Sequence, residues 1–144
     1  MVKIVFASDH AGVDLKSFLI ESVDLNRFVC ADLGPDSSDS VDYPDYAHPL
    51  ATKIMSKDAE LGVLICGSGN GVCMTANKYQ NVRAALCWDT ELAELARQHN
   101  NANVICIPAR FVSQTKALEM LKVFLNTSFE GGRHERRVDK IAIC

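Results

Sequence analysis

Short apolar runs rich in β-branched residues alternate with amphipathic helical patterns along this chain. The runs cover residues 2–6, 28–31, 61–66, 82–87 and 103–107, and they are typical of strands buried on both faces. Between them, apolar side chains recur at helical spacing in residues 11–19, 47–54, 92–96 and 118–125. Neighbouring parallel strands need crossover connections, and helical crossovers cover the faces of a sheet. The alternation therefore predicts an α/β fold, doubly wound around a parallel sheet, with ligands beyond the carboxyl ends of its strands.

The length and charge of the chain limit its organisation and its partners. With 144 residues and 48% hydrophobic content, we expect a single domain over residues 1–144. A formal net charge of −3 argues against general nucleic-acid binding, which needs a basic surface. No apolar run approaches the ~20 residues of a membrane helix, and the N-terminus lacks the layout of a secretion signal. We therefore expect a cytoplasmic protein that binds neither nucleic acid nor membrane.

The six cysteines are predicted to be reduced thiols. They are Cys30, Cys66, Cys73, Cys87, Cys106 and Cys144. Their spacing is irregular and four of them lie in or beside strand-like runs, which favours thiols over disulfides. Because the chain has no CxxC pair and no HxxxH pair, a metal site is not expected.

Cys66 ends the third apolar run and is followed at once by a glycine-rich loop. The loop residues are Gly67, Ser68, Gly69, Asn70 and Gly71. Glycines let successive N–H groups point at an anion, and a helix expected at residues 72–78 would aim its positive end at the same place. Three glycines in five residues favour an oxyanion or phosphate cradle over a plain tight turn. A thiol beside a helix N-terminus is favoured as thiolate and suits a general base or a nucleophile, whereas a buried structural cysteine is the alternative.

Val72, directly after this loop, distinguishes its sequence from those of better-known anion-binding loops. A Walker A loop needs Lys and Ser or Thr at the positions of Val72 and Cys73. Val72 also replaces the third glycine of a dinucleotide fingerprint, although Asp89 lies near the distance expected for a ribose-binding acid. A cysteine phosphatase loop would carry arginine at position 72. Dinucleotide binding therefore stays open as a weak competitor, while triphosphate and phosphatase chemistry are unsupported.

Titratable and basic groups stand at three further places. Asp9 and His10 follow the first strand, where an anionic ligand is expected, although Asp9 also suits a helix N-cap. His99 ends a helical pattern, either as a C-terminal cap or as a second acid/base group. Arg133 and Arg137 follow a Gly-Gly pair and share one face of a helix. They form either a phosphate clamp or an ordinary solvated face.

Six motifs stand along nearly the whole chain: "SDHAG", "DYP", "CGSGNG", "NK", "RQHNNANV" and "EGGRHERRV". In this order and spacing they resemble the motifs of type B ribose-5-phosphate isomerases, a family that also holds galactose-6-phosphate and allose-6-phosphate isomerases. The resemblance implies a three-layer Rossmann-like sandwich with a five-stranded parallel sheet and a C-terminal helical tail. It also implies a homodimer with shared active sites, able to pair further into tetramers, and no metal or organic cofactor. The implied reaction interconverts ribose 5-phosphate and ribulose 5-phosphate in the non-oxidative branch of the pentose phosphate pathway.

The same resemblance implies roles for individual residues. Cys66 would move a proton between C2 and C1 of the sugar through an enediolate, and His99 of the partner subunit would open the sugar ring. Ser68 stands where many members have threonine, and its hydroxyl would assist proton transfer. The backbone of residues 67–71 resembles the anion hole of the family. Sugar-hydroxyl contacts are implied for Asp9 and Asn100, and phosphate contacts for His10, Arg110, Arg133 and Arg137.

Two alternatives to this function stay open. Some members carry a glutamate base at the position of Val72, so Cys66 places this chain in the thiol group of the family. The "GSGNG" loop nevertheless resembles that of the glutamate group, which leaves the sugar open. The same chemistry on allose 6-phosphate or galactose 6-phosphate is one alternative. A non-catalytic nucleotide-binding α/β module, in which Cys66 is inert, is the other.

Overall fold

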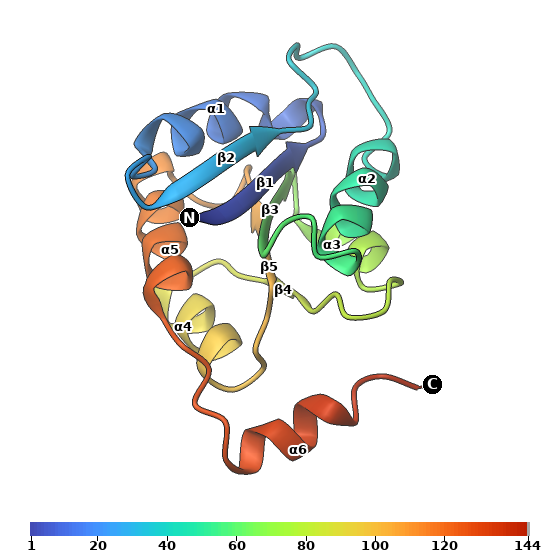
Figure 1. Cartoon of the computed structure of the whole chain (residues 1–144). Helices are drawn as coiled ribbons and strands as arrows, with labels where there is room; N and C mark the ends of the chain where they lie inside the picture. The colour runs from blue at the N-terminus through green and yellow to red at the C-terminus, as the bar shows by residue number, and fades with distance from the viewer. Residues whose placement is uncertain (144) are drawn as a thin grey trace.

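A parallel five-stranded sheet forms the centre of the protein (Figure 1). The structure is a computed structural model that describes residues 1–143. The strands are β1 Val2–Ser8, β2 Phe28–Asp32, β3 Leu61–Cys66, β4 Ala84–Leu86 and β5 Val104–Pro108. They stand in the order β2-β1-β3-β5-β4, and every neighbouring pair is parallel. The predicted α/β fold is confirmed.

Helices cover both faces of this sheet. They are η1 His10–Gly12, α1 Val13–Ser22, α2 Pro44–Met55, α3 Asn70–Ala76, α4 Thr90–Gln98, α5 Gln114–Asn126 and α6 Arg133–Asp139. The side chains of α1, α4 and α5 join one buried cluster and those of α2 and α3 join the other, which makes the expected three layers. α6 contributes to neither cluster and forms the helical tail. Within residues 1–143, no helix is both long and apolar enough to cross a membrane.

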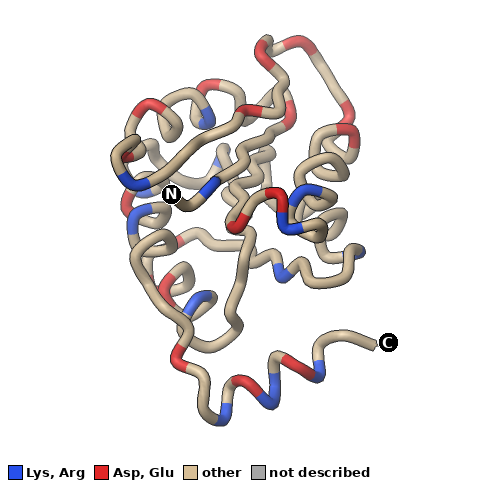
Figure 2. The backbone as a smooth tube through the Cα atoms, in the orientation of Figure 1, with Lys and Arg blue, Asp and Glu red and all other residues tan. Residues whose placement is uncertain are grey.

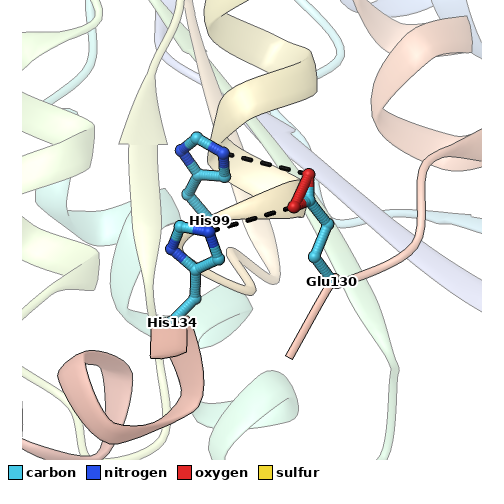
Figure 3. A group of neighbouring side chains, drawn as sticks. All are labelled: His99, Glu130 and His134. Atoms are coloured by element: carbon cyan, nitrogen blue, oxygen red, sulfur yellow. Dashed lines mark ion pairs between the residues drawn. The ribbon is translucent and has the colours of Figure 1, made fainter. Parts of the chain in front are cut away.

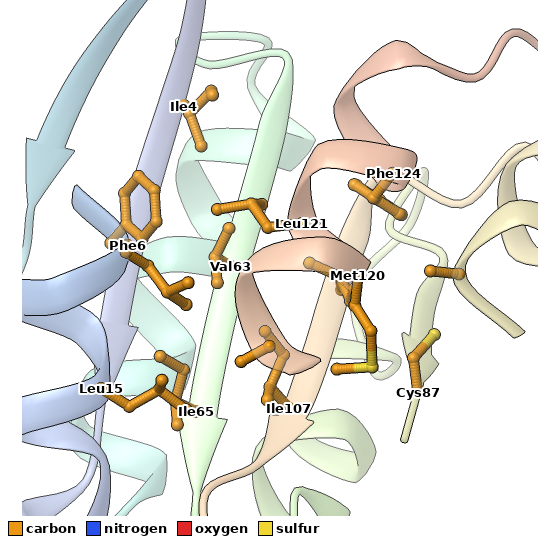
Figure 4. Close-up of a cluster of buried hydrophobic side chains, with 14 of the residues drawn as sticks. Ile4, Phe6, Leu15, Val63, Ile65, Cys87, Ile107, Met120, Leu121 and Phe124 are labelled. Carbon is orange, nitrogen blue, oxygen red and sulfur yellow. The ribbon is translucent and has the colours of Figure 1, made fainter. Parts of the chain in front are cut away.

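Successive residues of the inner strands point to opposite faces. Ile4 and Phe6 lie in the cluster under α1 and α5 (Figure 4), whereas Val5 and Ala7 lie in the opposite one. The expectation that all five strands are buried on both faces is wrong at the two edges. Val29 of β2 is 42% exposed, and the three residues of β4 are half-buried. An edge strand has a single neighbour, and the helices cover the middle of the sheet.

The carboxyl ends of β1 and β3 meet where the direction of strand addition reverses. β2 lies on one side of β1, and β3, β5 and β4 lie in that spatial order on the other side. Ser8 is paired with Ile65, and the N–H of Asp9 donates to the Ile65 carbonyl at 3.0 Å. Open α/β sheets bind ligands at such a switch point. The fold therefore brings Asp9 next to the end of β3, which is Cys66.

Short-range signals fix where the helices begin. Asp9, Asp89 and Ser113 each accept a hydrogen bond from a backbone N–H that follows within three residues. Pro44 occupies the first turn of α2, where its missing N–H would have no partner in any case. The capping interpretation of Asp9 is therefore confirmed, and it holds the acid at the edge of the sheet.

Candidate active site

Cys66 is the last residue of β3 and stands at the carboxyl edge of the sheet. The residue is only 5% exposed, and its Sγ accepts a hydrogen bond from the N–H of Gly69 at 3.1 Å. The chain turns back to the sulfur because Gly69 has φ 76°, in the left-handed region that glycine enters without strain. α3 begins at Asn70, two residues before the expected start, so its positive end directly follows the loop.

Two of the other cysteines in the described part of the chain, Cys87 and Cys106, are thiols of the buried core. Cys30, Cys66, Cys73, Cys87 and Cys106 are all free thiols, which confirms the prediction for them, and Cys144 lies outside the described residues. Burial raises the pKa of Cys87 to about 12, with a further contribution from Cys73. Burial also raises the pKa of Cys106 well above its usual value. These two thiols stay protonated in the core, whereas Cys66 stands at a strand end beside a glycine loop.

Arg110 lies against the loop that follows Cys66. A Cβ added to Gly67 would lie 3.0 Å from Nη1 of Arg110, so the guanidinium rests on this glycine. The N–H of Arg110 donates to the Gly67 carbonyl at 3.1 Å, and that of Ala109 donates to the Cys66 carbonyl at 2.9 Å. The end of β5 is thereby tied to the thiol, and a cation stands beside the predicted anion cradle.

The exposed side of the loop carries one hydroxyl and one amide side chain. Ser68 and Asn70 both face solvent, and the N–H of Asn70 donates to Oγ of Ser68 at 3.3 Å. A Cβ added to Gly71 would lie 2.5 Å from Cε1 of Tyr43, so the Tyr43 ring contacts this glycine. Tyr43 is not among the site residues predicted from sequence, where its signal is the "DYP" motif.

His10 links the end of β1 to the long connection before α2. Its Nδ1 accepts a hydrogen bond from the N–H of Val41 at 3.1 Å. This bond fixes the orientation of the imidazole at the same edge as Asp9 and Cys66. We call Asp9, His10, Cys66, residues 67–71 and Arg110 the thiol half-site.

The remaining predicted residues gather elsewhere, around the end of α4 and the start of α6. His99 is the C-cap of α4, and the exposed Asn100 follows it. Arg133 and Arg137 lie on α6, as the spacing predicts. We call the following set the imidazole half-site: His99, Asn100, Glu130, Arg133, His134 and Arg137.

One chain does not bring the two half-sites together. Arg97 and Asn101, on either side of His99, line a cavity of about 930 Å³ together with Leu61, the first residue of β3. The end of α4 is therefore near the amino edge of the sheet, while Cys66 is at the carboxyl edge. In Figure 1, α6 likewise lies away from the loops that follow β1 and β3.

Two imidazoles and a carboxylate form the centre of the imidazole half-site (Figure 3). The rings of His99 and His134 stack with centroids 4.1 Å apart and planes 11° from parallel. Nε2 of His99 lies 3.9 Å from one oxygen of Glu130, and Nε2 of His134 lies 3.9 Å from the other. Burial lowers the pKa of His134, and the guanidinium of Arg133 lowers it further. His134 is therefore uncharged at neutral pH.

The same three groups could in principle hold a metal ion, because their ligand atoms lie within 4.8 Å of one another. Two histidines that share one metal must aim their nitrogen lone pairs at a common point. Rings stacked 11° from parallel aim them side by side instead. The arrangement suits proton chemistry better than metal binding.

α6 mixes its charges rather than carrying a purely basic surface. Figure 2 shows Lys and Arg alternating with Asp and Glu along this helix. Arg133 and Arg137 are exposed and, four residues apart, share one side of the helix. A pair of guanidiniums on one side can bind the oxygens of a single phosphate.

Comparison with known proteins places the chain in a family. The sequence profile of the Ribose/Galactose Isomerase family matches residues 4–141. The chain belongs to this family. It is 49% identical over 140 residues to the probable ribose-5-phosphate isomerase B of Mycoplasma genitalium, covering 96% of this chain and 92% of that protein. It is 37% identical over 141 residues to ribose-5-phosphate isomerase B of Escherichia coli, covering 98% and 95%.

Solved structures of the family share this fold throughout. The ribose 5-phosphate isomerase of Thermotoga maritima matches with a TM-score of 0.94 and 45% identity over 97% of both chains. The ribose-5-phosphate isomerase B of Mycoplasma genitalium, solved with bound ribulose-5-phosphate, matches with a TM-score of 0.92 and 47% identity over 97% and 93% of the two chains. The resemblance and the Rossmann-like fold inferred from sequence are confirmed, and the chain is an isomerase.

Proposed function

We propose that this chain interconverts ribose 5-phosphate and ribulose 5-phosphate in the cytoplasm, as a single isomerase domain of the non-oxidative pentose phosphate pathway. The observation that carries the proposal is the thiol of Cys66 at the switch point of the sheet, held by the Gly69 N–H. A relative at 47% identity has been solved with ribulose-5-phosphate bound, which supports the substrate class.

In this proposal Cys66 acts as the base. Its thiolate takes the proton from C2 of the open aldose, and the electron pair moves into the C1 carbonyl to give an enediolate. Return of the proton to C1, with transfer of the hydroxyl proton from O2 to O1, gives the ketose. Those N–H groups of residues 67–71 that are not already bonded within the loop, together with the nearby Arg110, would stabilise the negative oxygen. One lost donor of this kind typically costs about 3 kcal/mol of barrier. The hydroxyl of Ser68 assists the transfer between the oxygens.

The separation of the two half-sites supports a homodimer. In one chain the residues around His99 stand near the amino edge of the sheet and Cys66 stands at the carboxyl edge. A second copy would supply His99, Arg133 and Arg137 to the thiol half-site of the first, and the symmetric contact would complete both sites.

In this proposal the two half-sites bind the substrate together. Asp9 and Asn100 contact sugar hydroxyls, and His99 opens the furanose ring. The phosphate is held by His10, Arg110, Arg133 and Arg137. Binding energy from the phosphate, which lies away from the reacting carbons, keeps C1 and C2 beside the thiol.

A substrate panel tests the proposal. Purified protein is assayed with ribose 5-phosphate, allose 6-phosphate and galactose 6-phosphate, and ketose formation is measured directly. We expect the highest kcat/KM with ribose 5-phosphate. A higher value with either hexose phosphate would transfer the same chemistry to that sugar, and no turnover of any of the three would refute the isomerase proposal.

A further inference from the structure

We infer that His134 and Glu130 are positioning residues that hold the imidazole of His99 in one orientation and one tautomer for opening of the sugar ring. This inference rests on the proposed function, in which His99 performs that step. Neither His134 nor Glu130 needs to touch the sugar.

The chain builds this arrangement through the backbone as well as the side chains. The N–H of Glu130 donates to the carbonyl of Gln98 at 3.1 Å, directly before His99, and the N–H of His134 donates to Gly131 at 3.1 Å. The φ of Gly131 is 68°, which lets the chain turn sharply into α6. Glu130 and His134 are thereby fixed to the end of α4, although more than 30 residues separate them from His99 in the sequence.

Stacking fixes the plane of the His99 ring. His134 is 8% exposed, so its ring is a buried support, whereas the side chain of His99 is 39% exposed and open to a ligand. The titratable and charged groups that act on His134 are His99 on α4, Glu130 before α6, and Arg133 and Arg137 on its own helix. Because burial and the guanidiniums of Arg133 and Arg137 lower the pKa of His134, it presents an uncharged face to His99.

Glu130 selects the tautomer of His99. Its carboxylate lies 3.9 Å from Nε2 of His99, and an anion on that side favours the form with the hydrogen on Nε2. The lone pair is then on Nδ1, where it can accept the proton of the O1 hydroxyl. As the bond between C1 and O4 breaks, C1 becomes the aldehyde carbonyl, and Nδ1 of His99 passes the proton taken from O1 on to O4, so atoms and charge balance.

The test measures ring opening without isomerisation. In a Cys66→Ala background, exchange NMR follows the enzyme-catalysed interconversion of the α and β anomers of ribose 5-phosphate, which requires the ring to open. Adding Glu130→Gln or His134→Ala should slow this exchange about tenfold or more, as for loss of orientation of a general base. His134→Phe, which keeps an uncharged ring in the stack, should retain most of the exchange. The control is Glu135→Gln, an exposed carboxylate on the same helix, which should leave the exchange unchanged.

Two outcomes distinguish a failure of this inference from a failure of the proposed function. If Cys66→Ala/His99→Ala exchanges the anomers as fast as Cys66→Ala alone, His99 does not open the ring and the proposed function is wrong on that point. If His99→Ala abolishes exchange while Glu130→Gln and His134→Ala both retain it, the positioning roles are refuted. The thermal midpoints of Glu130→Gln and His134→Ala, compared with that of His134→Phe, check that the loss of exchange does not come from unfolding.

Discussion

Replacing Gly69 with alanine should destabilise the protein and displace the loop around Cys66. Gly69 has φ 76°, a conformation that costs an L-residue roughly 1–2 kcal/mol. The new Cβ would also lie 2.5 Å from Cδ1 of Leu86, 3.2 Å from the backbone nitrogen of Pro108 and 3.3 Å from the carbonyl carbon of Ile107. The leucine can rotate, but β5 is central and cannot move freely. We estimate a total loss of about 2–4 kcal/mol in the free energy of unfolding.

Gly131→Ala is the matched control for this variant. Gly131 has φ 68°, yet a Cβ there would meet nothing within 4 Å. It therefore carries the backbone cost without the contacts, and should lose at most about 2 kcal/mol.

Both variants are compared with wild type by urea unfolding followed by circular dichroism. For a chain of this length 1 kcal/mol corresponds to roughly 3 °C in the midpoint of thermal unfolding, so Gly69→Ala should melt roughly 6–12 °C lower than wild type. If Gly69→Ala loses no more unfolding free energy than Gly131→Ala, the loop does not approach β5 as closely as the structure shows.

Three further predictions use other parts of the structure. Lys16 is 1% exposed and donates to Asp32 at 2.7 Å and to the Pro35 carbonyl at 2.6 Å. Lys16→Met should therefore cost about 1–3 kcal/mol of unfolding free energy, whereas Lys122→Met, at an exposed position, should cost almost nothing. Equal losses for the two variants would contradict a stabilising role for the bonds of Lys16. Arg137→Ala should raise KM for ribose 5-phosphate with little change in kcat, whereas an equal effect of Arg136→Ala would remove Arg137 from the phosphate clamp. Because the pKa of His134 is lowered in the folded protein, the unfolded chain takes up a proton first as pH falls below about 6.5, so stability is full above that pH and declines below it. His134→Phe should therefore flatten the fall in melting temperature between about pH 7.5 and 5, and an unchanged slope would contradict the shift.

Hydrophobic periodicity predicts the sheet of this protein well because the inner strands are buried on both faces. Residues 61–66 are predicted and observed as a strand. The fourth strand is shorter than predicted, Ala84–Leu86 rather than 82–87. Before Ala84 the side chain of Asn103 accepts the N–H of Arg83 and donates to the Asn81 carbonyl. These side-chain bonds take the place of part of the regular backbone pairing, and apolar content does not predict them.

Local sequence patterns group the candidate site residues only where the residues lie in one loop. Cys66 and residues 67–71 stand together in sequence, and the structure keeps them together through the bond from the Gly69 N–H to the sulfur. The pairing of His99 with Glu130 and His134 depends on how the tail returns to the end of α4 through the Glu130 N–H. The spacing of residues along the chain does not predict this contact between the tail and α4. The positions of Glu130 and His134 beside His99 therefore follow only from the fold.

The proton carried by Cys66 is the centre of the proposed mechanism, and labelled substrate tests it directly. Ribose 5-phosphate with deuterium at C2 is incubated with wild type, Cys66→Ala and Cys30→Ser, and loss of the label from C2 is followed by NMR. Wild type and Cys30→Ser should remove the label at equal rates, and Cys66→Ala should be slower by about 10²–10⁴-fold, the usual contribution of a general base, with an unchanged melting temperature. Loss of the label by Cys66→Ala at the wild-type rate would show that another group takes the proton.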